Sequence, residues 1–213
     1  RYGNLFDMYE EITDVSPYNE PMMIYPAIHY TPGGVWVDYE LQTSIKGLFA
    51  IGECNFSDHG ANRLGASALM QGLADGYFVL PYTIQNYLAD QITVPRFSTS
   101  LPEFDKAEKD VKDRIARLMN IKGKSSVDSI HKKLGHIMWD YVGMGRTAEG
   151  LQKGIQMIKE LRKEFYTDLF IPQLEGVNTE LEKALRLEDF FLMGLLVAHD
   201  ALTRNESCGG HFR

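Results

Sequence analysis

The chain has 213 residues, of which 44% are hydrophobic, and such a length and composition are ordinary for a globular protein with one large or two small domains. Its formal net charge is −7 and it has no block of lysine and arginine, which argues against a nucleic-acid surface because phosphates are bound by clustered positive charge. We therefore expect a folded, acidic protein without a nucleic-acid partner.

The two cysteines, Cys54 and Cys208, lie far apart in the sequence and lack the CxxC spacing of zinc and redox motifs, so we expect reduced thiols. The apolar run that begins at Phe190 is interrupted by His199 and Asp200 and falls short of the roughly 18 residues of a membrane span. It predicts a buried helix. The chain opens without a signal peptide and stops abruptly at Arg213, which predicts an excised fragment of a longer protein.

The first half of the sequence predicts a helical lead-in and then extended segments. Residues 1–20 are polar and end between Pro17 and Pro21, where helix is disfavoured. Residues 22–30 (MMIYPAIHY) and 34–40 (GVWVDYE) have strand-like content around a glycine turn. Residues 45–51 (IKGLFAI) form a short apolar run of the kind that is buried on both faces of a sheet.

A loop follows Glu53 and leads into a predicted helix from about Ser67 to Val79, which we expect Pro81 to end. Residues 81–103 contain Pro95 and Pro102 and several Ser and Thr residues, so they predict a linker to a different kind of structure.

From Phe104 onward the apolar residues recur with the period of helices. Four helices are predicted: one from Phe104, one capped near Ser125 or Ser126, one from Thr147, and one from Asn178 or Thr179, where T-E-L-E resembles a capping box. The expected buried stripes are Phe104, Ala107, Val111, Ile115, Leu118 and Met119; Leu134, Ile137, Met138 and Tyr141; and Leu151, Ile155, Ile158, Leu161 and Phe165. The fold class is therefore α+β: a few strands and one helix, then a helical bundle.

Chemistry is concentrated between His29 and Leu69. Glu53 follows an apolar segment and, at the carboxyl end of a strand, could accept ribose hydroxyl groups, although a surface glutamate fits the same position. The loop from His59 to Ser67 delivers Asn62 and Arg63 and enters a helix whose N-terminus favours negative charge. Arg63 could bind the carboxylate of a ligand through two parallel hydrogen bonds, or it could form a structural ion pair.

His29 precedes a glycine turn, where a ring N–H could hold the other end of a diacid, or serve as a structural donor. A second pattern, Gly143, Gly145 and Ala148, matches the dinucleotide motif GxGxxA. It follows an amphipathic helix and lacks the βαβ unit that gives these glycines their role, so we interpret it as a turn between helices.

Together, HYTPGG (29–34), KGLFAIGEC (46–54) and HGANRLGASAL (59–69) resemble the succinate dehydrogenase and fumarate reductase flavoprotein family, in the same order and at similar spacing. The second half, ending NESCGGHFR, is similar to the C-terminal helical domain of that family. The resemblance implies the end of a capping or substrate domain at 1–24, the C-terminal part of a Rossmann-like FAD-binding domain at 25–80, the linker at 81–103 and a helical domain at 104–213.

By this resemblance, His29 and Arg63 would bind the carboxylates of succinate or fumarate, and Glu53, Ala68 and Leu69 would contact FAD. Ala68 stands where the family has a serine, so only backbone contact is left there, and neighbouring Ser67 is a candidate to compensate. Cys208 stands where the commoner ESRGAH form has an arginine.

The implied reaction is hydride transfer between a substrate carbon and FAD, with electrons passed to an iron-sulfur subunit, a membrane anchor and quinone. The resemblance implies a peripheral place on the cytoplasmic side of the inner membrane. The family's proton-carrying arginine, its dinucleotide glycines and the histidine that tethers FAD lie upstream of these motifs. We therefore expect no catalytic residue in this chain, half of the FAD site, and no turnover by the chain alone.

Two alternatives stay open. L-aspartate oxidase shares the fold but usually carries a cysteine where Pro32 stands. The chain could also contain a docking module for an iron-sulfur subunit, without chemistry of its own.

Overall fold

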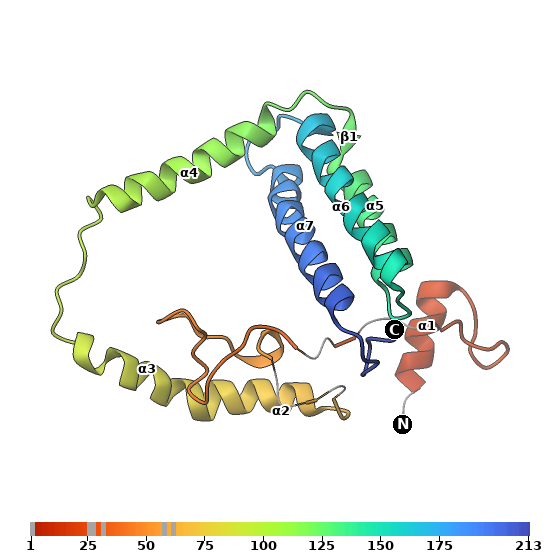
Figure 1. Cartoon of the computed structure of the whole chain (residues 1–213). Coiled ribbons are helices and arrows are strands. Elements are labelled where there is room, and N and C mark those ends of the chain that lie inside the picture. Colours follow the sequence, from red (N-terminus) through yellow and green to blue (C-terminus); the bar gives the residue numbers. More distant parts are fainter. Residues whose placement is uncertain (1–2, 25–28, 31–32, 57–58, 61–62) are drawn as a thin grey trace. The chain divides into compact units, whose positions relative to one another are not determined.

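The computed structural model describes residues 3–24, 29–30, 33–56, 59–60 and 63–213 (Figure 1). It divides into two compact units, one formed by residues 1–58 and 66–79, and the other by residues 59–65 and 80–213. We call the first the site unit and the second the helical unit, and each is described by itself.

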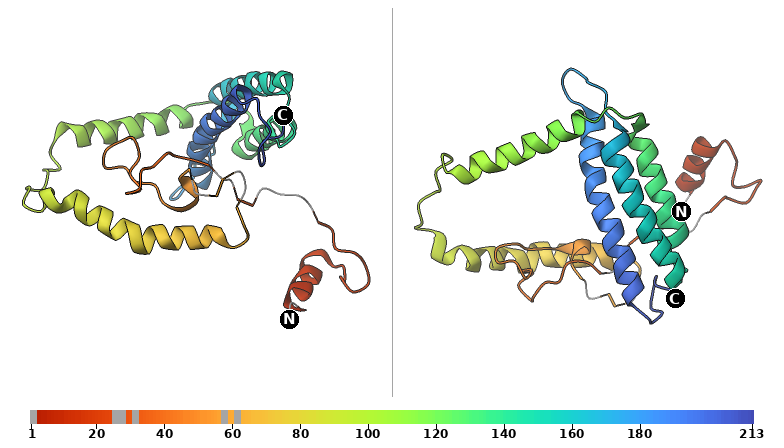
Figure 2. Two further views of the ribbon diagram at one scale, coloured as in Figure 1. Left: turned by 60° about the horizontal axis from the view of Figure 1, so that its bottom comes forward. Right: turned by 45° about the horizontal axis from the view of Figure 1, so that its top comes forward.

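Three helices form the body of the helical unit: α5 (Val127–Val142), α6 (Ala148–Asp168) and α7 (Thr179–Thr203). They run side by side in both views of Figure 2. Each helix is preceded by an N-cap residue whose side chain accepts a hydrogen bond from a backbone N–H in the first turn of that helix. These residues are Ser126, Thr147 and Asn178. Such a bond satisfies one of the N–H groups that a helix start leaves unpaired. The three predicted starts are confirmed, with Asn178 as the cap of α7.

The core of the helical unit is apolar. The predicted stripe of α6 is fully inside, and Phe165 packs edge to face against Phe191 of α7 with ring centroids 5.6 Å apart. Burial of such side chains stabilises a fold by about 1.5–3 kcal/mol each. The core residues are Leu118, Val127, Ile130, Leu134, Ile137, Ile158, Leu161, Phe165, Leu169, Ile171, Ala184, Leu187 and Phe191.

Helix α4 (Pro102–Met119) begins where the period predicted it, with proline in its first turn. Its predicted buried stripe is wrong for the first turns, because Phe104 and Val111 are about half exposed and only Leu118 is buried. Figure 1 shows why: α4 leaves the bundle, and only its C-terminal end lies against α7.

A short parallel pair, β1 (Ser125–Ser126) and β2 (Leu169–Phe170), joins the start of α5 to the end of α6. Ser125 Oγ donates to Asp168 at 2.7 Å, and the backbone N–H of Lys124 donates to the same carboxylate at 3.1 Å. The turn between α5 and α6 contains Gly143 and Gly145, as predicted for the GxGxxA pattern.

Helix α7 departs from the prediction of a fully buried helix. Phe191, Gly194 and Ala198 face the core, but Met193 is 56% and Leu196 63% exposed. A helix with apolar residues on every side is not necessarily buried on every side. In α7 it is the stripe that faces α5 and α6 that packs against these helices.

The site unit begins with α1 (Gly3–Thr13), as the lead-in predicted. Between residues 33 and 56, all of which are described, the extended segments meet only in isolated bridges, Val35 with Asn55 and Gln42 with Phe49. The predicted buried strand at 45–51 is wrong: Gly47 has φ +83° and Leu48 N–H donates back to Ile45 O at 3.0 Å, so the run turns on itself. The strand predicted at 22–30 falls partly on residues 25–28, outside the described residues.

The helix predicted from Ser67 starts there as α2 (Ser67–Ala74) and passes into a π-helical turn, Asp75–Val79. The prediction that Pro81 ends this helix is wrong, because Pro81 is the second residue of α3 (Leu80–Leu88). Pro81 closely follows the π-helical turn Asp75–Val79, which interrupts the regular backbone hydrogen-bond pattern that a proline inside an α-helix would otherwise break. The segment 81–103 thus starts as helix, with a 3-10 turn at Ala89–Gln91, and continues without regular structure to α4. The α+β class is confirmed.

Candidate functional site

A 3-10 turn at Gly52–Cys54 carries Glu53, and the glycine that ends HYTPGG packs against it. Val35 N–H donates to Cys54 O at 2.9 Å, and Phe56 N–H donates to Val35 O at 2.9 Å. A Cβ on Gly34 would lie 2.4 Å from Cys54 O, and Gly34 has φ +145°, so no side chain fits there. The first and second sequence motifs therefore meet.

The same turn is fastened to the helix of the third motif. Asp75 Oδ2 accepts hydrogen bonds from Gly52 N–H at 3.0 Å and from Asn55 Nδ2 at 3.3 Å. Gln71 Nε2 donates to Asn55 Oδ1 at 2.9 Å, and Tyr30 Oη donates to Gln71 Oε1 at 3.1 Å. Asn55 is only 3% exposed. We call the side chains of Tyr30, Gln71, Asn55 and Asp75 the polar chain. Within the site unit it links the first motif and the turn of the second to helix α2, which begins at the end of the third.

Sequence reasoning did not find the polar chain. A signal was present, because Gln71 and Asp75 are polar residues four apart in an otherwise small and apolar helix, and i,i+4 residues share a helix face. Their partners Tyr30 and Asn55 are far away in the sequence, and only the fold shows that they meet.

The structure locates the predicted flavin-contacting residues around this frame. Glu53 is exposed in the Gly52–Cys54 turn, Ala68 is half-buried and Leu69 is 78% exposed in the first turn of α2. Ser67, the candidate to compensate for the missing serine, is half-buried as the first residue of α2. Their roles toward FAD stay predictions.

The predicted dicarboxylate-binding residues are His29 and Arg63. His29 is exposed and precedes Tyr30, the first member of the polar chain. Arg63 is half-buried, and its guanidinium donates to Leu64 O at 3.3 Å. Residues 59–65 group with the helical unit, so the joint action of His29 and Arg63 on one diacid stays a prediction. Asn62 and Pro32 lie outside the described residues.

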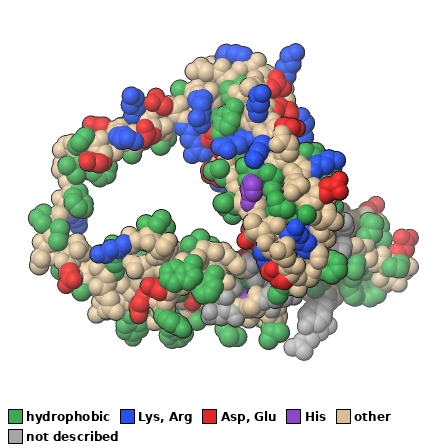
Figure 3. Space-filling view, viewed as in Figure 1, with side chains coloured by type: hydrophobic (Ala, Val, Ile, Leu, Met, Phe, Trp, Pro, Cys, Tyr) green, Lys and Arg blue, Asp and Glu red, His purple; other side chains and the backbone are tan. Residues whose placement is uncertain are grey.

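The donor set of α2 fits a flavin. The helix begins after Ala66, which has φ +64° and makes no side-chain cap bond to the first turn. A non-glycine residue in this left-handed region costs about 1–3 kcal/mol and such strain clusters at ligand sites. Apolar side chains also gather on the surface over α2 (Figure 3), including Leu69, Met70 and Leu73, all more than half exposed, which suits an apolar ring system.

One electrostatic cluster of the helical unit surrounds the buried carboxylate of Glu188. It accepts from Arg114, from Arg117 at 2.8 Å and from Tyr166 Oη at 2.7 Å. Burial raises the pKa of Tyr166, and its bond to Glu188 raises it further. The bond from Arg114 to Glu188 raises the pKa of Arg114. These contacts join α4, α6 and α7, so the cluster fixes helices rather than offering a free acid or base.

The C-terminal residues close the end of the bundle. Cys208 and His211 pair in a hairpin, and Phe212 exchanges backbone hydrogen bonds with Met144 and Arg146 in the turn before α6. His211 Nδ1 lies 2.6 Å from Arg146 Nη1, and burial together with nearby Arg204 lowers the pKa of Arg146. Cys208, where the family's commoner form has arginine, is exposed and free.

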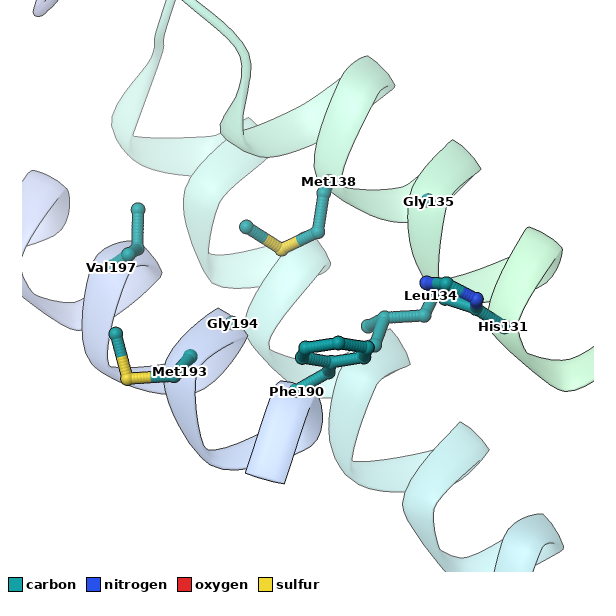
Figure 4. Close-up of a pocket in the computed structure, with 8 residues that line it drawn as sticks. All are labelled: His131, Leu134, Gly135, Met138, Phe190, Met193, Gly194 and Val197. Carbon is teal, nitrogen blue, oxygen red and sulfur yellow. The ribbon is translucent and has the colours of Figure 1, made fainter. Parts of the chain in front are cut away.

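An apolar groove of about 260 Å³ lies between α5 and α7 (Figure 4). His131 and Phe190 stack with ring centroids 5.3 Å apart, and Met138 and Met193 line it from α5 and α7. Among the described residues that line the groove, His131 is the one titratable side chain.

Over the described part of the chain, no cluster of three or more His, Cys, Asp or Glu side chains is arranged to hold a metal ion. No helix among the described residues is both long enough and apolar enough to cross a membrane.

Two family models match the chain. The FAD binding domain matches residues 5–69, and the fumarate reductase flavoprotein C-terminal model matches residues 131–213. The succinate dehydrogenase flavoprotein subunit of Bacillus subtilis is 32% identical over the whole chain, which covers 36% of that protein. The fumarate reductase flavoprotein subunit of Haemophilus influenzae is 35% identical over 93% of the chain, which covers 32% of that protein.

A solved structure of Escherichia coli quinol fumarate reductase superposes with a TM-score of 0.84 and 29% identity, covering 98% of this chain and 35% of that one. L-aspartate oxidase of Yersinia pestis is similar at 29% identity over 91% of the chain. The chain spans about a third of the length of the curated relatives that it matches.

Proposed function

The chain belongs to the succinate dehydrogenase and fumarate reductase flavoprotein family, and from that premise we propose that it is part of a longer flavoprotein that interconverts succinate and fumarate. The polar chain carries this proposal, because it joins Tyr30 of the first motif and the Gly52 turn of the second to the helix that begins at the end of the third. That the chain spans only a third of its relatives supports its action as one part of a larger protein. We propose the domain division 1–24, 25–80, 81–103 and 104–213 for this part.

FAD, which this family binds, would accept or donate the hydride. Glu53 would hold its polar portion from the Gly52–Cys54 turn. Ala68 and Leu69 would contact it from the first turn of α2, where Ala68 has only its backbone to offer. The positive end of the helix dipole would stabilise negative charge on the bound group. With the other half of the site absent, the chain alone would hold FAD poorly and would not turn over.

His29 and Arg63 would bind the two carboxylates of the substrate. A guanidinium forms two parallel hydrogen bonds to a carboxylate, which fixes its orientation as well as its position. The positive charge of Arg63 and the ring N–H of His29 would together polarise the double bond of fumarate.

We propose that electrons pass to an iron-sulfur subunit, and through a membrane anchor to quinone, with the flavoprotein bound peripherally on the cytoplasmic side of the inner membrane. The likeness of the chain to the flavoprotein of a solved quinol fumarate reductase supports this proposal.

The test uses the full-length flavoprotein that carries this chain. Succinate-dependent reduction of an artificial electron acceptor should fall at least about a hundredfold in kcat/KM in Arg63→Lys, because an ammonium cannot reproduce the two-pronged bond. Arg96→Lys, a change at an exposed arginine, is the matched control and should be unaffected. Undiminished turnover in Arg63→Lys would contradict the assignment.

Assays of the same full-length flavoprotein also distinguish the two alternative functions. L-aspartate oxidase activity would appear as aspartate-dependent peroxide formation, and would overturn the choice of substrate. The exposed groove between α5 and α7 favours the second alternative, a docking module. If Arg63→Ala abolishes turnover and assembly with the iron-sulfur subunit survives, the chain contributes to the chemistry. Loss of assembly with soluble activity retained would favour docking.

A further inference from the structure

We propose that the helix beginning at α2 positions both ends of the site: Gln71 holds Tyr30, beside the substrate-binding His29, and Asp75 holds the turn that carries Glu53. This inference rests on the proposed function and adds two positioning residues to it. Neither belongs to the three motifs that carry the resemblance, and both were found only from their hydrogen bonds.

Gln71 is suited to its place because one amide provides both an acceptor and a donor. Its Oε1 accepts from Tyr30 Oη at 3.1 Å, and its Nε2 donates to Asn55 Oδ1 at 2.9 Å. Tyr30 is half-buried and His29 is exposed. The ring of His29 therefore takes its position from the backbone that Tyr30 anchors, and a loosened Tyr30 would let His29 move away from the diacid.

Asp75 acts at the other end of the polar chain. A single oxygen, Oδ2, accepts from Gly52 N–H at 3.0 Å and from Asn55 Nδ2 at 3.3 Å. Gly52 has φ +66°, a conformation that glycine adopts without strain, and the ionised acceptor strengthens the bond that fixes the start of the turn. Asp75 also opens the π-helical turn Asp75–Val79, a geometry that recurs at functional sites.

Asn55 connects the two ends. Its amide group is buried and is bonded to Gln71 through Oδ1 and to Asp75 through Nδ2. A purely structural network would change the unfolding temperature and leave the surviving folded enzyme unaltered. A positioning network changes how the folded enzyme binds substrate or how readily its flavin is reduced. We therefore test the substrate end through the KM for succinate and the flavin end through the midpoint potential of the flavin.

The substrate end is tested in the full-length flavoprotein with bound FAD. Tyr30→Phe and Gln71→Met each remove the bond between these residues, and each should raise the KM for succinate about tenfold with little change in kcat. The double variant should be no worse than Gln71→Met alone, because Gln71→Met already breaks the bond that Tyr30→Phe removes. Gln71→Glu keeps an acceptor for Tyr30 and should restore most of the KM.

The flavin end is tested by Asp75→Asn, which keeps the size of the side chain and removes its charge. The two-electron midpoint potential of the flavin should move to a more positive value, because a negative charge near the site opposes reduction, while the KM for succinate stays close to wild type. Asp90→Asn, an exposed aspartate in the 3-10 turn after α3, is the matched control and should leave the potential unchanged.

Wild-type protein without succinate or fumarate turnover would overturn the proposed function itself. With wild-type turnover present, an unchanged KM in Tyr30→Phe and an unchanged potential in Asp75→Asn would overturn this inference alone. If Gln71→Met fails to fold, Tyr30→Phe still decides the substrate end, because it removes one oxygen and leaves the amide of Gln71 in place.

Discussion

In the helical unit, large side chains such as Phe165, Phe191 and Leu151 are fully buried, whereas the buried apolar residues described in the site unit are only Val37, Leu41 and Ala50. The site unit relies instead on hydrogen bonds between polar side chains and loop backbone, which contribute about 0.5–1.5 kcal/mol each in net terms. The bundle therefore carries its own stability, and the site unit presents its groups on a frame that few apolar contacts support.

The two tryptophans allow the comparison to be measured. Trp36 belongs to the site unit and Trp139 to α5 of the helical unit. With Trp36→Phe, fluorescence reports unfolding of the helical unit, and with Trp139→Phe it reports unfolding of the site unit.

The largest effect is expected from Phe191→Ala, which removes a fully buried ring from the core of the bundle. Deleting such a ring costs about 3–5 kcal/mol, because apolar burial is lost and a cavity is left. Urea unfolding followed through Trp139 should show this loss, and the transition followed through Trp36 should move far less. Equal shifts of the unfolding transitions followed through Trp139 and Trp36 would show that the two units unfold as one, and would contradict a separate stability for each unit.

Glu188→Ala should come next. Loss of this carboxylate leaves Arg114, Arg117 and Tyr166 without their shared acceptor. We expect a cost of about 2–3 kcal/mol at Trp139, below the usual value for a broken buried pair because both guanidinium groups can reach water. Glu182→Ala, at an exposed pair with Arg186, is the control and should cost less than about 0.5 kcal/mol. A Glu188 effect no larger than this control would contradict the assigned role.

A smaller effect is expected from Leu69→Ala in the site unit. Leu69 is 78% exposed, so the stability reported by Trp36 should change by less than about 0.5 kcal/mol. In the full-length flavoprotein the same change should weaken flavin retention, because Leu69 is proposed to contact FAD. A loss of more than about 1 kcal/mol in the chain alone would show that Leu69 packs within the site unit.

The smallest effect is expected from Asp168→Asn at the β1–β2 junction. The hydroxyl of Ser125 and then the backbone N–H of Lys124 hold the pKa of Asp168 below its ordinary value of 3.8. A depressed carboxyl pKa contributes stability above pH 3.8, and this contribution is lost as pH falls through the folded-state pKa. Unfolding followed through Trp139 should therefore depend less on pH below 3.8 in Asp168→Asn than in Asp140→Asn, at an exposed aspartate of α5. Identical profiles would contradict this reasoning.

The same contrast explains what the sequence could predict. The helix starts at Ser126, Thr147 and Asn178 were predictable because a capping side chain and an apolar period of 3.6 are both local signals. The strand predicted at 45–51 does not form because the backbone turns at Gly47, and the apolar content of a segment does not reveal such a turn. The exposed face of α7 was missed because hydrophobicity alone does not say which neighbours a helix will have.

At the site, the motif residues His29, Glu53 and Arg63 could be named from the sequence, but the contacts that organise them could not. Tyr30 and Gln71 are separated by 41 positions, and nothing local predicts their hydrogen bond. The exposed Leu69 and the buried Asn55 show the same difference, since burial depends on the whole fold.

Each unit also carries one free thiol at its surface, Cys54 in the Gly52–Cys54 turn and Cys208 in the C-terminal hairpin. Because both cysteines are exposed and neither is in a disulfide, a pair of spectroscopic probes can be attached without introducing new cysteines. A distance measured between probes on Cys54 and Cys208 would report how the site unit and the bundle are arranged in solution.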